Sequence, residues 1–118
     1  MHNFKELIVW QKARKLVKEI YLIVNSLPDE EKFGINSQIK RASVSIPANI
    51  AEGAGRNTDN DFGRFLDIAN GSSFELETLL ILAVDLNYLS EIKFNLVLKD
   101  IEEIQKMIYS LRNKMKKS

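Results

Sequence analysis

The sequence predicts an all-α protein, an antiparallel up-down-up-down four-helix bundle in which residues 1–118 form a single domain. Four segments carry apolar residues at steps of three and four, and clusters of helix-breaking residues fall between them. The chain has two prolines and five glycines, too few for a β-protein with many turns. A three-four repeat is typical of helices that pack at about +20°. Short connections make successive helices antiparallel.

The first helix is expected from about Phe4 to Ser26. Its apolar positions repeat at Ala13, Leu16, Ile20, Ile23 and Leu27. A loop that contains Pro28 and Gly34 then separates it from the second segment.

The second helix is expected from Ile35 to Ala54, and Gly53 with Gly55 supplies its stop. Its apolar face carries Ile35, Ile39, Ala42, Ile46 and Asn49. Pro47 lies inside this helix, where it has no N–H to donate to the carbonyl of Ser43. We expect a bend at this point, with the hydroxyls of Ser43 and Ser45 as candidates to satisfy the freed groups.

The third helix is expected to begin after Thr58, which Asp61 completes as a capping box. Its core positions are Phe62, Phe65, Ala69, Ser72, Leu76, Leu79, Ala83 and Leu86. Ser90 is the expected N-cap of the fourth helix. That helix repeats at Phe94, Val97, Ile101, Ile104, Ile108, Leu111 and Met115.

Small residues concentrate in the second helix and at the middle of the third, at Gly71-Ser72-Ser73. A glycine inside a helix costs roughly 1 kcal/mol relative to alanine. Close approach of two helix backbones is the simplest compensation. The alternative is a ligand that contacts the exposed backbone around Pro47 and Gly71.

The third helix is apolar on every side between residues 74 and 84, and the first helix is apolar all round at residues 20–24. Helices of this kind are buried on every side. A four-helix bundle covers only part of each helix, and soluble monomers rarely expose the large apolar patch that remains. We therefore predict a homo-oligomer whose interface includes Tyr21, Leu22, Phe74, Ile81 and Val84.

Composition excludes several classes of chemistry. Cysteine is absent and the one histidine is His2, so the usual thiol nucleophile, thiolate metal ligand and general base are missing. We expect no enzyme activity, no cofactor and no metal. The N-terminal residues do not resemble a signal peptide and no apolar run reaches the ~20 residues of a membrane span, which leads us to expect a cytoplasmic protein with no membrane contact.

Net charge is only +1, which leaves local basic patches possible. In the predicted topology, the first helix starts, the fourth ends and the second connects to the third at one end of the bundle. Acidic residues gather at the other end, at Asp29, Glu30, Glu31, Asp85 and Glu91. The basic residues expected near the first end are candidates for binding RNA or DNA backbone without reading sequence: Lys12, Arg14, Lys15, Arg56, Arg64, Arg112, Lys114, Lys116 and Lys117.

Three alternatives remain open at this stage. The basic residues can be a solvated surface, and Arg41, Asn49, Glu52, Arg56, Arg64 and Glu75 can form a structural polar network beside the helix contacts. The protein can also be a protein-interaction adaptor of the same shape that binds no nucleic acid.

Two long segments, QIKRASVSIPANIAEGAGR at residues 38–56 and FLDIANGSSFELET at residues 65–78, resemble the 23S rRNA-intervening sequence protein family, as does FKELIVWQ at residues 4–11. The resemblance covers nearly the whole chain and implies a bacterial four-helix bundle with no catalytic residues. The fold also looks like that of the accessory variability protein of diversity-generating retroelements. That likeness implies a homopentamer with a basic surface that binds nucleic acid and a reverse transcriptase.

Overall fold

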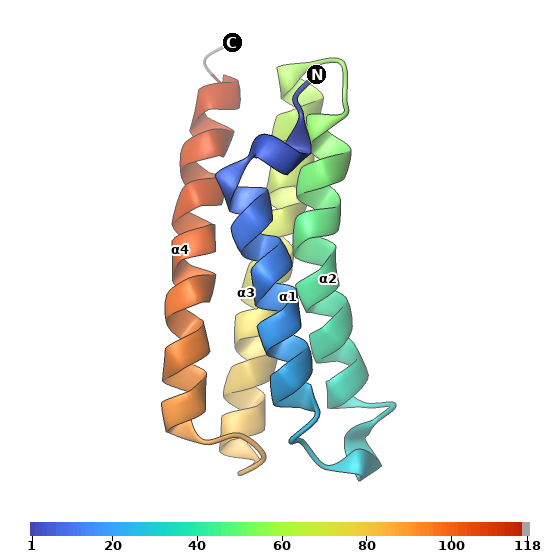
Figure 1. Cartoon of the computed structure of the whole chain (residues 1–118), viewed down its shortest axis with the longest axis vertical. Helices are drawn as coiled ribbons and strands as arrows, with labels where there is room; N and C mark the ends of the chain where they lie inside the picture. The colour runs from blue at the N-terminus through green and yellow to red at the C-terminus, as the bar shows by residue number, and fades with distance from the viewer. Residues whose placement is uncertain (117–118) are drawn as a thin grey trace.

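The computed structural model describes residues 1–116, which form four long α-helices joined by short connections (Figure 1). They are α1 (Ile8–Val24), α2 (Ile35–Ala54), α3 (Asp59–Asp85) and α4 (Glu91–Lys116). Two 3-10 turns, η1 (Phe4–Glu6) and η2 (Asp29–Glu31), precede α1 and α2. Each helix packs against its neighbours in the ring order α1, α2, α3, α4. The predicted up-down-up-down bundle is confirmed.

The N-terminus, the α2–α3 connection and the end of α4 meet at one end of the bundle, here called the upper end (Figure 1). The α1–α2 and α3–α4 connections form the lower end. The structure therefore confirms that the start of the first helix, the end of the fourth helix and the connection between the second and third helices lie at the same end of the bundle. Lys117 and Ser118 lie outside the described residues.

The first helix starts later than predicted. Asn3 caps the short turn η1 by accepting a hydrogen bond from the Lys5 N–H at 3.2 Å, and Leu7 then adopts an extended conformation. The regular helix begins only at Ile8. The three-four repeat missed this break because Phe4 and Leu7 also pack against the core, as continuous helix positions would.

Both predicted N-caps are present at the starts of α3 and α4. The Thr58 hydroxyl accepts from the Asp61 N–H at 3.1 Å, and the Ser90 hydroxyl accepts from the Lys93 N–H at 3.2 Å. Each bond satisfies one of the backbone donors that a helix start leaves unpaired. Asn87, the one non-glycine residue with positive φ among residues 1–116, helps to turn the chain between these helices.

The core consists of the apolar faces of all four helices and contains most of the predicted positions. On α2 the repeat selected Asn49, whereas the structure buries Ile50, and on α3 it selected Ser72, whereas the structure buries Ser73.

Also on α3, Leu86 is 53% exposed, although the repeat placed it in the core, and Leu80 is fully buried, although the repeat left it out of the core. The next core position can follow the previous one by three or by four residues, so the sequence leaves two candidates at each turn. On α3 the buried residues include Leu76, Leu80 and Ala83. Leu86 is also the C-cap residue that directly follows Asp85, the last residue of α3.

The helix α2 continues through Pro47, and a polar network lies beside it. Asn49 donates to the carbonyl of Ser45 at 2.8 Å and to the Ser45 hydroxyl at 2.9 Å, while the Ser45 and Ser72 hydroxyls lie 2.8 Å apart and join α2 to α3. Ser43 donates instead to the Lys40 carbonyl at 2.8 Å. The hydroxyls of Ser43 and Ser45 therefore bond to other groups and not to the Ser43 carbonyl, which lacks a donor because residue 47 is proline.

Close helix approach occurs at Gly53 and not at Gly71. A Cβ built on Gly53 would lie 2.7 Å from the Cβ of Phe65 and 2.9 Å from Cδ1 of Phe62. A Cβ on Gly71 would meet nothing within 4 Å. The prediction of a close approach at Gly71 is therefore wrong within this chain, because that residue faces outward.

Substitution of Gly53 by alanine should destabilise the fold by about 1–3 kcal/mol, since the new methyl group forces α2 and α3 apart. Gly55→Ala is the matched control, because its Cβ would meet only backbone oxygens at 3.6 and 3.8 Å. Urea denaturation followed by circular dichroism measures both variants. Equal stability of Gly53→Ala and Gly55→Ala would show that the contact is not tight.

Candidate interaction surfaces

The upper end of the bundle gathers most of the predicted basic residues. Arg56 follows α2, Arg64 lies near the start of α3, and Arg112, Lys114 and Lys116 belong to the last turns of α4. Lys12, Arg14 and Lys15 lie further along α1, towards its middle. Lys117 was predicted with this group and falls outside the described residues.

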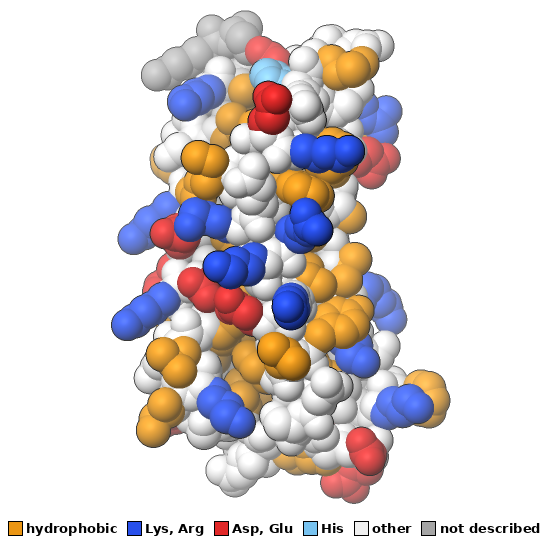
Figure 2. All heavy atoms as spheres, viewed as in Figure 1, with side chains coloured by type: hydrophobic (Ala, Val, Ile, Leu, Met, Phe, Trp, Pro, Cys, Tyr) orange, Lys and Arg blue, Asp and Glu red, His pale blue; other side chains and the backbone are white. Residues whose placement is uncertain are grey.

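Acidic neighbours pair with half of the described members of this group. The pairs are Lys12–Glu103 at 2.8 Å, Arg56–Glu52 at 3.2 Å, Arg64–Asp61 at 3.6 Å and Arg112–Asp67 at 2.9 Å. On the face seen in Figure 2, Lys and Arg side chains alternate with Asp and Glu along the length of the bundle. The surface is therefore more mixed in charge than the linear sequence suggests.

Two of the arginines also have a structural role. The guanidinium groups of Arg56 and Arg64 lie 4.7 and 5.4 Å from the ring centroid of Phe65, so both cover this aromatic side chain. The Arg112 guanidinium lies against Gly63, where a Cβ would be 2.8 Å from its Cζ atom. Within residues 1–116, Arg14, Lys15, Lys114 and Lys116 have no ion-pair partner.

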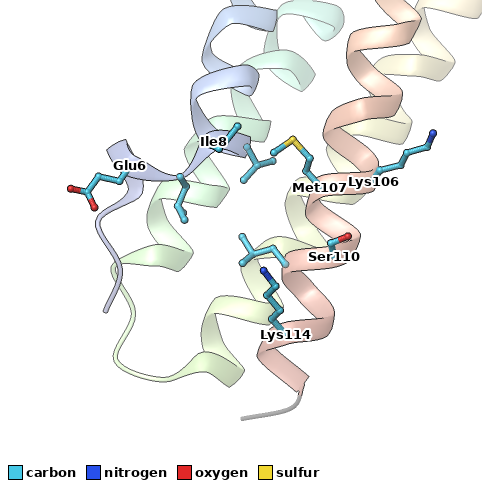
Figure 3. A pocket seen from close by; sticks show the side chains of 9 residues that line it. Glu6, Ile8, Lys106, Met107, Ser110 and Lys114 are labelled. Carbon is cyan, nitrogen blue, oxygen red and sulfur yellow. The ribbon is translucent and has the colours of Figure 1, made fainter.

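The line of contact between α1 and α4, here called the α1–α4 seam, has the least extensive packing of the four neighbouring helix pairs. Two hollows lie along it. The upper one, of about 470 Å³, is lined by Ile8, Met107 and Leu111 with their neighbours. Figure 3 shows Met107 extending from α4 towards the start of α1, while Glu6 and Lys106 point away from the hollow. The lower hollow is lined by Leu22, Leu96 and Val97 among others.

Charged side chains lie between the apolar parts of the two hollows, and two of them, Glu19 and Asp100, also line the lower hollow. Burial raises the pKa of Glu19 on α1, and hydrogen bonding to and the negative charge of Asp100 on α4 raise this pKa further, although Lys15 acts in the opposite direction. The hydrogen bond and charge of Glu103 raise the pKa of Lys12. The seam thus alternates from apolar to charged to apolar along the bundle.

The predicted interface residues are exposed, with one exception. Tyr21, Leu22, Phe74 and Ile81 have exposed fractions of 40–63%, whereas Val84 is half-buried against the core. They do not form one patch, because Leu22 lines the lower hollow of the seam and Phe74 lines a groove between α3 and α4.

Sequence reasoning missed a regular row of outward residues on α3. Ile68, Gly71, Glu75, Leu82 and Leu86 follow one another at steps of three, four, seven and four, and all five are exposed. This row, here called the outward stripe, is a second three-four repeat that runs beside the buried one. The second periodicity was present in the sequence but was masked by the apolar residues between the two repeats.

A polar hollow of about 360 Å³ adjoins the outward stripe between α2 and α3. Arg41, Ser45 and Glu75 line it with neighbouring residues. Arg41 and Glu75 are exposed and form no ion pair among the described residues, so the predicted polar network includes neither of them. Both charges remain available to another molecule.

Residues 1–116 contain no cluster of three acidic or histidine side chains that could hold a metal ion. In the same range, no helix combines the length and the apolar character that crossing a bilayer requires.

A family model described as 23S rRNA-intervening sequence protein matches residues 5–110. The crystal structure of a protein of unknown function from the S23 ribosomal protein family of Bacteroides thetaiotaomicron is similar, with a TM-score of 0.82 and 30% sequence identity. The likeness covers 88% of this chain and 97% of that one. No functionally curated protein matches the chain.

Glu19→Gln should stabilise the protein at pH 8 by no more than about 1 kcal/mol. The folded state binds a proton on Glu19 more tightly than the unfolded state does. The protonated carboxyl therefore stabilises the wild-type fold at low pH, and this stabilisation is lost as the pH rises through the raised pKa. Thermal denaturation at pH 8 and pH 4 measures the difference. The gain should disappear at pH 4, and Glu102→Gln, which changes an exposed carboxylate on α4, should show no such pattern. A gain that is equal at both pH values would contradict the assignment.

Proposed function

The chain belongs to the 23S rRNA-intervening sequence protein family, and from this premise we propose that it is a non-enzymatic scaffold whose copies associate with one another. The observation that carries the proposal is the exposure of large apolar side chains on several helices. Leu22, Ile92 and Leu96 are 63–76% exposed near the lower end, while Leu82 and Leu86 are 44% and 53% exposed on α3.

Burial of apolar surface contributes about 25 cal/mol per Å². Exposed apolar side chains of this size on more than one side of a 118-residue chain are therefore a substantial driving force for association. Charged side chains between them keep the surface hydrated until a partner covers it. Other copies of the chain are always available at matching concentration, which makes them the first partner to test.

Sedimentation velocity over a hundredfold dilution tests self-association. We expect one species heavier than the 13.5 kDa chain that persists at the lowest concentration. Leu22→Lys combined with Leu86→Lys should increase the monomer fraction, because both substitutions place charge in the buried contact. Lys32→Glu in the α1–α2 connection is the control, because it changes a charge outside the predicted interface. Wild-type protein that remains monomeric at every concentration would refute the proposal.

A second candidate function is binding of RNA or DNA backbone at the upper end. It is favoured by the position of Lys114 and Lys116 at the end of α4, with no acidic partner among residues 1–116. The neighbouring pairs Arg56–Glu52 and Arg64–Asp61 are exposed, and pairs of this kind are worth only about 0.2–1 kcal/mol. A phosphate can therefore compete for these arginines. Association of subunits in parallel would multiply the number of cations on one face.

Replacement of both Lys114 and Lys116 by glutamine should weaken RNA binding and lower the slope of log K against log salt by about 1.4, since each phosphate contact to a single strand contributes about 0.7. Lys32→Gln combined with Lys93→Gln removes the same charge from the lower end and should leave the slope unchanged. Fluorescence anisotropy with a single-stranded RNA measures both. Equal slopes for the two variants would count against binding at the upper end, and no binding at low salt would leave the protein-interaction adaptor as the function.

A further inference from the structure

We propose that the upper hollow of the α1–α4 seam binds a fatty acid anion, whose carboxylate lies against Lys114 and whose alkyl chain runs along α4 towards Met107. This site is separate from the apolar side chains on which the proposed self-association rests, and its occupancy does not depend on that association. The hollow has an apolar lining, an inward-pointing cation and a length that suits a short alkyl chain.

The lining of the hollow is apolar where the start of α1 faces α4. Leu7, Met107 and Leu111 are half-buried against the core, and Ile8 beside them is 58% exposed. The volume of about 470 Å³ lies within the roughly 300–1,000 Å³ that is usual for small-molecule sites. Water in this hollow contacts mostly carbon, so an alkyl chain that displaces the water is favoured by the hydrophobic effect.

Lys114 supplies the charge that faces the hollow. Figure 3 shows Glu6 and Lys106 pointing away, whereas Lys114 points from the last turns of α4 back towards the start of α1. Among residues 1–116, Lys114 has no ion-pair partner. A cation without a partner beside an apolar lining is complementary to a ligand that combines an anionic head with an apolar tail.

The charge of the site favours a carboxylate as the head group. One lysine carries one positive charge, which a carboxylate balances. A phosphate monoester carries about −1.5 to −2 charges at pH 7 and would leave part of its charge unpaired next to apolar side chains. A single-chain carboxylate is therefore the expected ligand.

The spacing of residues on α4 sets the length of the alkyl chain. Met107, Leu111 and Lys114 follow one another at steps of four and three, so they lie on one face of the helix. From Lys114 to Met107 the helix advances about 10 Å at 1.5 Å per residue. An extended alkyl chain advances about 1.3 Å per C–C bond of about 1.5 Å, so about eight carbons span this distance. The unbranched, flexible side chain of Met107 can adapt to the end of the tail.

The lower hollow of the same seam has the opposite charge. Its apolar lining is formed by Leu22, Ile23, Leu96 and Val97. The carboxyl groups of Glu19 and Asp100 also line it, together with Lys93. Two carboxylates against one lysine repel a fatty acid anion. Of the two hollows, the upper one therefore suits this ligand.

Titration with sodium decanoate, followed by NMR of isotope-labelled methionine methyl groups, tests the site in the whole chain at pH 8. The chain has three methionines, and of these Met107 lines the upper hollow, whereas Met1 and Met115 do not. We expect the Met107 resonance to shift and to saturate, while the other two move little. Equal shifts of all three resonances, or no shift of Met107 up to about 10 mM decanoate, would overturn the proposal.

A series of probes tests the chemical class of the ligand. Affinity should increase about two- to fourfold per CH₂ from butanoate to octanoate and change little beyond decanoate, because longer tails extend out of the hollow. Decanol and decyltrimethylammonium have the same tail with a neutral and a cationic head, and both should bind more weakly than decanoate. Decanol that binds as tightly as decanoate would overturn the assignment of an anionic ligand.

Lys114→Gln should lower the affinity for decanoate by up to about fivefold, as expected for an exposed ion pair, and leave the affinity for decanol unchanged. Lys116→Gln is the matched control, because it removes the same charge from the same end of α4 and this residue lines a different hollow. An equal loss in both variants would indicate general attraction to the upper end and would overturn the site. Binding of RNA, in contrast, is expected to draw on both lysines.

Ile8→Gln tests the tail contact at an exposed position that the fold tolerates, and it should weaken decanoate and decanol alike. Leu96→Gln places the same polar group in the lower hollow, where the wild-type leucine is 64% exposed, and should change neither affinity. An equal effect of Leu96→Gln would assign the ligand to the wrong hollow and contradict the proposal.

The variant that combines Leu22→Lys with Leu86→Lys separates ligand binding from self-association, since it alters the proposed contact between copies and leaves the upper hollow intact. We expect the same affinity for decanoate in this variant and in the wild-type chain. Binding to the variant alone would show that another copy fills the hollow in the wild-type protein, which would overturn the proposal. A wild-type chain that stays monomeric and binds decanoate would refute self-association and support this site.

Discussion

A helix in a four-helix bundle can bury only the side that faces its neighbours, and this limit shapes the surface of the whole molecule. The helix α3 carries one three-four repeat that packs into the core and a second one that faces outward. Packing within the chain satisfies only the first repeat. The second leaves apolar side chains and an uncovered glycine in water, and contacts between copies would cover them.

The α1–α4 seam results from the same limit. The polar Ser45–Ser72 contact and the tight approach at Gly53 bring α2 close to α3, while α1 and α4 are the neighbours with the least extensive packing. Apolar hollows open above and below their charged contacts, among them Lys12–Glu103. A loosely packed seam on one side and a protruding stripe on the other give the chain two different faces, which suit a repeating assembly better than a single pair.

The fold was predictable because apolar spacing, capping residues and breaker positions all agree. Thr58 and Ser90 mark helix starts that the structure reproduces. The candidate surfaces were harder to predict, since they depend on which of two adjacent residues turns inward. On α2, for example, the repeat selected Asn49, whereas the neighbouring Ile50 is the residue that the structure buries. The basic group looked continuous in the sequence, but partners distant along the chain, such as Asp67 for Arg112, appear only once the helices are packed.

Native mass spectrometry of the wild-type protein most directly tests the central claim, which is that another copy of the chain covers the unburied repeat of α3. We expect an oligomer heavier than the 13.5 kDa chain that persists at the lowest concentration. A protein that remains a monomer at every concentration would contradict the claim that this surface needs a partner.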